Sequence, residues 1–187
     1  REVFNAPGGG TLAVQMLRAA AGELAIKVGE GEPFGVVNVG DPLAVAEACA
    51  KSGVTRLEDD HGRPSLFQGI SRDDSPINVL VGSRKFTEGW NSWRVSSIGL
   101  MRMGQNEGTQ IIQLFGRGVR LRGYGMSLRR SKVLAYKPKP PQNMQLVETL
   151  HVFGVKADYM RRFRDWILEE VPEALEKETW DLPVLQT

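Results

Sequence analysis

The sequence predicts an α/β fold in which a mostly parallel sheet is covered by helices on both faces. Short apolar runs of strand-like composition recur along the chain, as at residues 35–39 (GVVNV) and 77–81 (INVLV). Stretches with helical periodicity alternate with these runs, and Gly and Pro punctuate the connections. Apolar strands that alternate with helices are typical of a parallel sheet buried on both sides. In such sheets, ligands bind beyond the carboxyl ends of the strands.

The first half of the chain is expected to contain three helices and two strands. Residues 12–21 carry apolar side chains at helical spacing. Asp41 as the N-cap and Pro42 in the first turn predict a helix over residues 43–51, which Gly53 ends. The remaining predictions are strands over residues 35–39 and 77–81 and a short helix near residues 65–70.

The second half continues the alternation. Strands are expected over residues 95–101 and 132–136, and helices over residues 108–119, 144–152 and 157–170. Pro138, Pro140 and Pro141 interrupt the chain between the last predicted strand and the helices after it. We therefore expect an α/β domain over residues 1–140 and a helical extension over residues 141–187.

Composition places the chain among soluble globular proteins. It has 187 residues, of which 41% are apolar and 25% charged. That length accommodates about one to one and a half domains. No apolar run reaches the roughly 18 residues that a membrane span needs. The single cysteine, Cys49, cannot form an internal disulfide and fits a reducing compartment, so we expect a cytoplasmic protein without contact to a membrane.

The charges are unevenly distributed, although the net charge is only +2. Between Gly108 and Val147 there is no Asp or Glu. A basic block can bind a polyanion, but it can equally be a solvated surface, and charge alone does not decide between them. The basic residues of this block are Arg117, Arg120, Arg122, Arg129, Arg130, Lys132, Lys137 and Lys139.

The segment QLFGRGVRLR, residues 113–122, has the most informative spacing. On a helix, Gln113, Arg117 and Arg120 share one face because they are separated by four and three residues. Guanidinium groups bind phosphate oxygens in a bidentate manner and stay charged at any working pH. The segment therefore predicts either a phosphate-binding face or a helix with surface arginines.

Two glycines and three apolar residues of the same segment predict how it packs. Ile112, Phe115 and Val119 are expected to form the packing face. Gly116 and Gly118 each cost roughly 0.8–1 kcal/mol relative to alanine inside a helix. This cost indicates that another surface approaches the helix backbone closely.

Two motifs resemble those of a known family. Gln113-x-x-Gly116-Arg117-x-x-Arg120 resembles the sixth motif of superfamily-two helicases. Upstream, VLVGS at residues 79–83 and TEGWN at residues 87–91 are similar to the fifth motif. The full string is most similar to the restriction-subunit-like DEAD/DEAH helicases of type III restriction enzymes, from restriction-modification systems. The resemblance covers residues 33–136 and implies the second RecA-like domain, a three-layer α/β fold.

The resemblance implies a site for ATP shared with an N-terminal RecA-like domain of the same polypeptide. Arg117 and Arg120 would be arginine fingers, and Gln113 would support the γ-phosphate or the attacking water. ATP and Mg²⁺ would be held mainly by that first domain, and no metal ligand is predicted in this chain. Gly89 and Gly116 would lie against the nucleotide, and Asn91 stands where the family usually has Asp.

The resemblance also implies contacts to nucleic acid, with DNA favoured. Ser83 stands where a hydroxyl residue binds the nucleic-acid backbone, and Arg84 and Lys85 could add phosphate contacts. The loop at Gly40 and Asp41 could contribute the amides of a helix N-terminus. One tryptophan lies within the fifth motif and another follows it, and they either stack on bases or pack the loop against a helix. These tryptophans are Trp90 and Trp93.

The function predicted from these motifs is the C-terminal motor domain of an ATP-dependent helicase or translocase. The chain lacks a phosphate-binding loop with its Lys and Ser/Thr, so alone it is expected to be inactive as a hydrolase. Two alternatives stay open. One is a degenerate RecA-like module that binds nucleic acid without a role in hydrolysis, and the other is a P-loop ATPase that acts on something other than nucleic acid.

Overall fold

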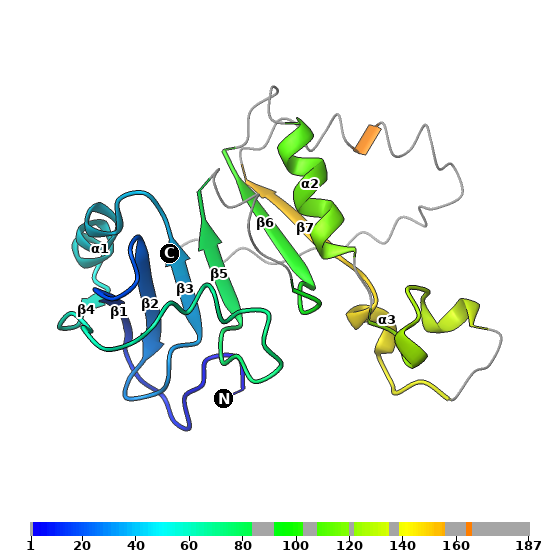
Figure 1. Cartoon of the computed structure of the whole chain (residues 1–187), viewed down its shortest axis with the longest axis horizontal. Helices are drawn as coiled ribbons and strands as arrows, with labels where there is room; N and C mark the ends of the chain where they lie inside the picture. Colours follow the sequence, from blue (N-terminus) through cyan, green and yellow to red (C-terminus); the bar gives the residue numbers. More distant parts are fainter. Residues whose placement is uncertain are drawn as a thin grey trace, which may run out of the picture.

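The computed structural model describes residues 2–83, 92–102, 108–119, 122–134, 139–155 and 164–165, and within them the chain has an α/β fold (Figure 1). A five-stranded sheet has the order β4-β1-β2-β3-β5, and β6 and β7 form a separate two-stranded sheet. Among the described residues, three of the five strand pairings are parallel and two are antiparallel. The strands are β1 (Leu12–Met16), β2 (Glu23–Val28), β3 (Gly35–Asn38), β4 (Thr55–Arg56), β5 (Val79–Gly82), β6 (Ser97–Met101) and β7 (His151–Val155), and the helices are α1 (Pro42–Lys51), α2 (Gly108–Gly118) and α3 (Met144–Val147).

The prediction of a helix over residues 12–21 is wrong, because this segment forms the strand β1. β1 pairs antiparallel with β2, a strand that the sequence analysis missed, and β2 pairs antiparallel with β3. The turn before β2 contains Gly22 at φ 81°, where a Cβ would lie 2.8 Å from the carbonyl oxygen of Val39. Pairing on both edges of β2 satisfies the backbone groups and outweighs the helical propensity of Leu, Met and Ala.

The predicted helix after β3 is confirmed as α1, and its caps explain its position. The Asp41 side chain accepts a hydrogen bond from the backbone N–H of Ala44 at 3.0 Å, and Pro42 occupies the first turn. Gly53, at φ 85°, follows the last turn in the left-handed region. The chain then enters β4, which pairs parallel with β1, so α1 crosses one face of the sheet.

The two faces of the five-stranded sheet are covered differently. On one face, α1 contributes Ala46 to a cluster with Met16, Leu24 and Val37. On the other face, Val36 packs against residues of the segment between β4 and β5. That segment is a series of turns, so the predicted helix near residues 65–70 is wrong and no helix covers this face within the described part of the chain. Its contribution to the core consists of Leu66, Phe67, Ile70 and Ile77.

A buried carboxylate holds the covering segment in place. Glu23, only 3% exposed, lies at the start of β2. It accepts hydrogen bonds from the backbone N–H groups of Leu66 at 2.9 Å and Phe67 at 3.2 Å, and from the hydroxyl of Ser65. These bonds give the buried carboxylate its hydrogen-bond donors. They also give an acceptor to backbone N–H groups of the turn, which are not part of a helix.

The second sheet corrects two further predictions. The predicted strand over residues 132–136 is wrong in its described part, since Ser131–Val133 is a 3-10 turn, and residues 135–136 lie outside the described residues. The predicted helix over residues 144–152 is only α3, and the chain continues as β7. β7 pairs parallel with β6, with Ser97 opposite His151, and this pairing connects the two sides of the predicted boundary at residue 140. Of the predicted helix over residues 157–170, only residues 164–165 are described.

No helix in the described ranges combines the length and the hydropathy that a membrane span requires.

Candidate functional site

The predicted phosphate-binding face lies on α2, whose range matches the expected helix within one residue. Ile111 is fully buried and Phe115 is 8% exposed, and both pack with Leu100 of β6. Gln113 is exposed and Arg117 is half-buried, one helical turn further along. Gln113 and Arg117 therefore lie outside the apolar contact with the sheet.

The predicted packing face of α2 was wrong at two of its three positions. Ile112 is 54% exposed and Val119 is 64% exposed, whereas Phe115 is buried as expected. The buried face consists of Ile111, Phe115 and Gly118 at spacings of four and three. Packing against β6 and β7 covers one of two neighbouring apolar stripes of α2, and helical periodicity alone cannot distinguish them.

The two glycines of the motif have different surroundings. A Cβ at Gly118 would lie 2.6 Å from Cδ1 of Leu150 and 3.2 Å from Cδ1 of Ile98, so the helix touches the second sheet there. At Gly116, no heavy atom of the described residues, apart from its chain neighbours and the backbone of the helix itself, lies within 4 Å of the same position. Close packing within this chain thus accounts for Gly118, while Gly116 faces open space.

A second group of predicted residues gathers at one edge of the large sheet. β3 and β5 are parallel neighbours, with Asn38 opposite Gly82. Gly40 and Asp41 follow the end of β3, Ser83 follows the end of β5, and all three are exposed. Parallel pairing therefore places these loops at the same carboxyl edge. The amide of Ala44 is already occupied by the carboxylate of Asp41, which leaves that amide unavailable to a phosphate.

Five predicted site residues lie outside the described part of the chain. They are Arg84, Lys85, Gly89, Asn91 and Arg120.

Two arginines that the sequence analysis did not assign to the site connect the segment before β5 to the rest of the molecule. Arg94 donates to the carbonyl oxygen of Ser75 at 3.0 Å and to Oδ1 of Asn78 at 2.9 Å. Arg122, beyond α2, forms an ion pair with Asp73 at 3.3 Å. These contacts span 16 to 49 residues of sequence, so no local pattern could have revealed them.

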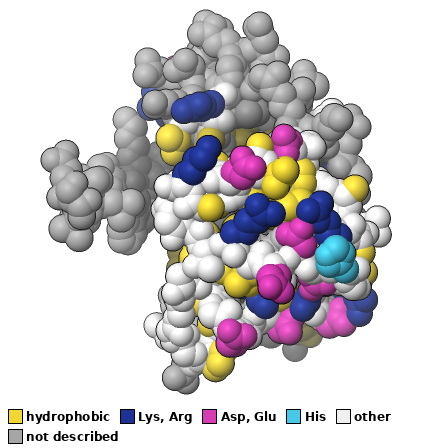
Figure 2. All heavy atoms as spheres, turned by 90° about the vertical axis from the view of Figure 1, so that its left-hand side faces the viewer, with side chains coloured by type: hydrophobic (Ala, Val, Ile, Leu, Met, Phe, Trp, Pro, Cys, Tyr) yellow, Lys and Arg dark blue, Asp and Glu magenta, His cyan; other side chains and the backbone are white. Residues whose placement is uncertain are grey.

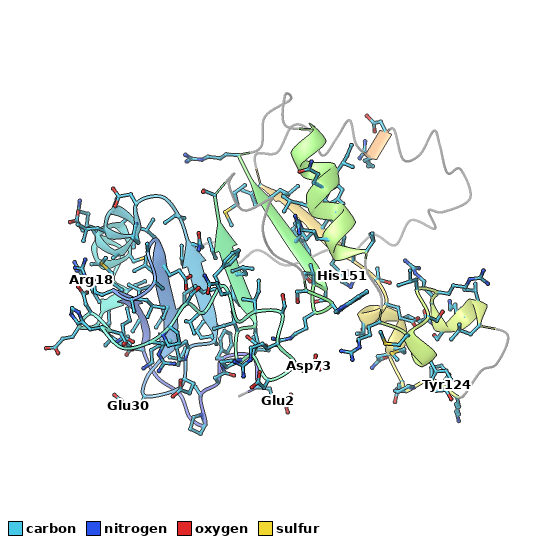
Figure 3. The ribbon with its side chains drawn as sticks, in the orientation of Figure 1. Glu2, Arg18, Glu30, Asp73, Tyr124 and His151 are labelled. Atoms are coloured by element: carbon cyan, nitrogen blue, oxygen red, sulfur yellow. The ribbon has the colours of Figure 1, made fainter. Side chains whose placement is uncertain are left out.

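Basic residues near β1 and β4 are paired with acids. Figure 2 shows Lys and Arg side chains interspersed with Asp and Glu on the side of the molecule that carries α1 and β4. Arg18, labelled in Figure 3, contacts Asp59 at 2.6 Å, and Arg63 contacts Glu32 at 3.0 Å. Such a mixed surface has no excess of positive charge and does not suit a polyanion.

Hydrogen bonds in this network lower the pKa of two carboxylates below 3.8. For Asp59 the main cause is the side-chain hydrogen bond from Arg18. For Asp60 the main causes are the backbone N–H groups of Arg63 and Gly62, each at 2.9 Å. Because the folded pKa lies below the unfolded value, the stabilisation is complete above pH 3.8 and is lost as pH falls through the folded pKa.

We expect Asp60→Asn to make the free energy of unfolding less dependent on pH in that acidic window. Asparagine keeps one acceptor oxygen for the two amides but has no proton to bind. Urea unfolding between about pH 5 and pH 2 would measure the slope for both proteins. Identical slopes for the variant and the wild type would show that Asp60 does not titrate differently in the folded chain.

No group of three or more His, Cys, Asp or Glu side chains that could hold a metal ion occurs within the described ranges. Comparisons with family models, curated proteins and solved structures return no match for the chain.

Proposed function

We propose that the chain is the second RecA-like domain of an ATP-dependent nucleic-acid helicase or translocase. The observation that carries the proposal is the arrangement of α2. Its Ile111–Phe115 face is anchored on β6, while Gln113 and Arg117 lie one turn apart outside that contact. A rigid helix that presents a guanidinium group beside an amide suits recognition of a phosphate.

ATP and Mg²⁺ would bind mainly to a first RecA-like domain, and Arg117 and Arg120 would reach the γ-phosphate from this chain. An arginine there stabilises the negative charge that develops during phosphoryl transfer. The open side of Gly116 leaves room for the other domain or the nucleotide to approach the backbone. The shared edge of β3 and β5 would bind nucleic acid through Ser83, Arg84 and Lys85.

The first test compares ATP hydrolysis by this chain alone and by a protein that joins it to a domain with a phosphate-binding loop. Both are assayed with and without single-stranded DNA or RNA. We expect activity that nucleic acid stimulates in the two-domain protein and none in the chain alone. A two-domain protein that binds nucleic acid but never hydrolyses ATP would instead support the binding-module alternative.

The two glycines of α2 offer a matched pair of variants. Gly116→Ala should stabilise the isolated chain by roughly 0.4–1 kcal/mol, because alanine favours the helix and meets no described atom. Gly118→Ala should lack this gain, because its methyl group would overlap Leu150 and force the ends of the Leu150 and Ile98 side chains to shift. Thermal and urea unfolding of both variants measure these changes.

The proposal further requires that Gly116→Ala lower kcat of the two-domain protein despite the gain in stability, by about tenfold to a hundredfold. A stabilised variant with unchanged kcat would mean that no nucleotide or domain approaches Gly116 during turnover.

A further inference from the structure

A cavity of about 840 Å³ opens beside the C-terminal end of α2. Its lining comes from the segment before β6, the end of α2 and the stretch between α2 and β7. Cavities of roughly 300–1,000 Å³ hold drug-sized ligands, so this one has room for a planar ring system. Apolar side chains line it, among them Val119, Leu128, Met144 and Val147.

Two aromatic side chains contribute to the cavity and are accessible from solvent. Trp93 is 42% exposed and Tyr124 is 62% exposed. Figure 3 shows Tyr124 on the segment that extends beyond α2, well separated from the large sheet. An exposed aromatic ring beside an apolar cavity is a suitable platform for stacking a flat ligand.

Positive charge surrounds the same cavity. Arg122, Arg130 and Lys139 line it and are exposed. Among the described lining residues the acidic one is Glu148, whose carboxylate accepts hydrogen bonds from the N–H of Ser131 at 2.8 Å and from its hydroxyl at 2.9 Å. The lining therefore carries an excess of positive charge, and its carboxylate is already engaged with the protein.

We infer that this cavity binds the bases of single-stranded nucleic acid, with Trp93 and Tyr124 as stacking residues and the three cations as phosphate contacts. The ligand must combine negative charge with flat apolar groups, and a single strand has both in every nucleotide. A duplex also carries phosphates, but its bases are stacked inside and cannot enter a cavity. The inference rests on the proposed function and adds a base-binding site that the helicase motifs do not include.

The test measures binding of fluorescent 15-mers to the 187-residue chain. The probes are oligo(dT), oligo(U), a strand of the same length and charge without bases, and a DNA duplex. We expect the wild type to bind oligo(dT) or oligo(U) more tightly than the strand without bases or the duplex. The comparison of oligo(dT) with oligo(U) shows whether DNA or RNA is preferred.

Variants separate stacking from charge. Trp93→Ala and Tyr124→Ala should each weaken binding of oligo(dT) by about tenfold and reduce the preference over the strand without bases. Trp93→Phe should restore most of the affinity, because phenylalanine still stacks. Phe153→Ala is the matched control, since Phe153 is 60% exposed on β7 and does not line the cavity. Circular dichroism and thermal unfolding verify that each variant is folded.

The ion pair between Arg122 and Asp73 adds a variant that should gain affinity. Asp73 is 87% exposed and competes with a phosphate for Arg122. Asp73→Asn removes that competitor, so oligo(dT) should bind about twofold to threefold more tightly, with a steeper dependence on salt. Arg130→Gln, at the cavity, should weaken binding of oligo(dT) and make it less dependent on salt. Lys51→Gln on α1, far from the cavity, is the control and should change neither the affinity nor its salt dependence.

The outcomes distinguish the inference from the proposed function. If oligo(dT) binds and the Trp93 and Tyr124 variants match the wild type, the cavity is not a base site and only this inference fails. Equal affinity for the strand without bases also overturns it, because the surface then recognises phosphate alone. If no strand binds, the inference fails together with the nucleic-acid part of the proposed function.

Discussion

Replacing Arg117 by alanine is expected to lower kcat for ATP hydrolysis by about a thousandfold in the two-domain protein. Arg117 lies on the same helix as Phe115, which is 8% exposed and packs on β6, so the backbone that carries the arginine is fixed by the core. A guanidinium group held in place loses little in reorganisation when charge develops on the γ-phosphoryl group. Affinity for nucleic acid should change little, because Arg117 belongs neither to the edge of β3 and β5 nor to the lining of the cavity beside α2.

Steady-state ATPase assays with saturating nucleic acid measure kcat, and fluorescence anisotropy measures the affinity. Arg117→Lys keeps the charge but loses the planar fork of donors, so its kcat should stay well below that of the wild type. Arg129→Ala is the control, because Arg129 is an exposed residue of the same basic block. Near-normal turnover of Arg117→Ala would contradict the arginine-finger role. A loss of binding without loss of turnover would favour a module that only binds nucleic acid.

Replacing Glu23 by alanine is expected to reduce the free energy of unfolding of the chain by about 3 kcal/mol. The carboxylate is 3% exposed and accepts three hydrogen bonds from residues 65–67. Alanine would leave the amides of Leu66 and Phe67 without their acceptor beside the core. The covering segment also contributes Ile70 to the cluster around Val36, so its displacement would expose apolar surface.

Urea unfolding at neutral pH gives the free energy, and the midpoint gives an independent comparison. Glu47→Ala, at an exposed position of α1, is the matched control and should change stability by less than about 0.5 kcal/mol. Ser65→Ala removes one of the three donors and should cost about 1 kcal/mol. If Glu23→Ala matches Glu47→Ala, the hydrogen bonds to the covering segment do not stabilise the fold.

The predictions that succeeded rest on short-range chemistry. α1 was expected because Asp41, Pro42 and Gly53 occur at the cap positions of one helix, and its range agrees with the structure within one residue. The strand at β3 and the helix α2 likewise follow from runs of apolar residues and from helical spacing. All of these signals lie within about a dozen residues, so they act before the chain has any tertiary contacts.

The predictions that failed depend on partners far along the chain. Residues 12–16 have helical spacing, but β2 and β4 pair with them and impose a strand. The segment His151–Val155 becomes β7 because β6, some fifty residues earlier, presents an edge to it. The free-energy difference between helix and strand that comes from intrinsic propensity is small. The backbone pairings and the burial that accompanies them contribute more, so they decide the outcome.

For the candidate site, the sequence by itself determined that Gln113 and Arg117 share one face of a helix, because residues four apart lie about one helical turn from each other. Only the tertiary structure decided that Gly118 meets Leu150 while Gly116 stays open, and that Gly40 and Ser83 share one edge of the sheet. It also assembled the cavity from Trp93, Tyr124 and Lys139. The physical reason is that helical period and capping are local properties of the chain, whereas close approach and cavities depend on which distant surfaces meet.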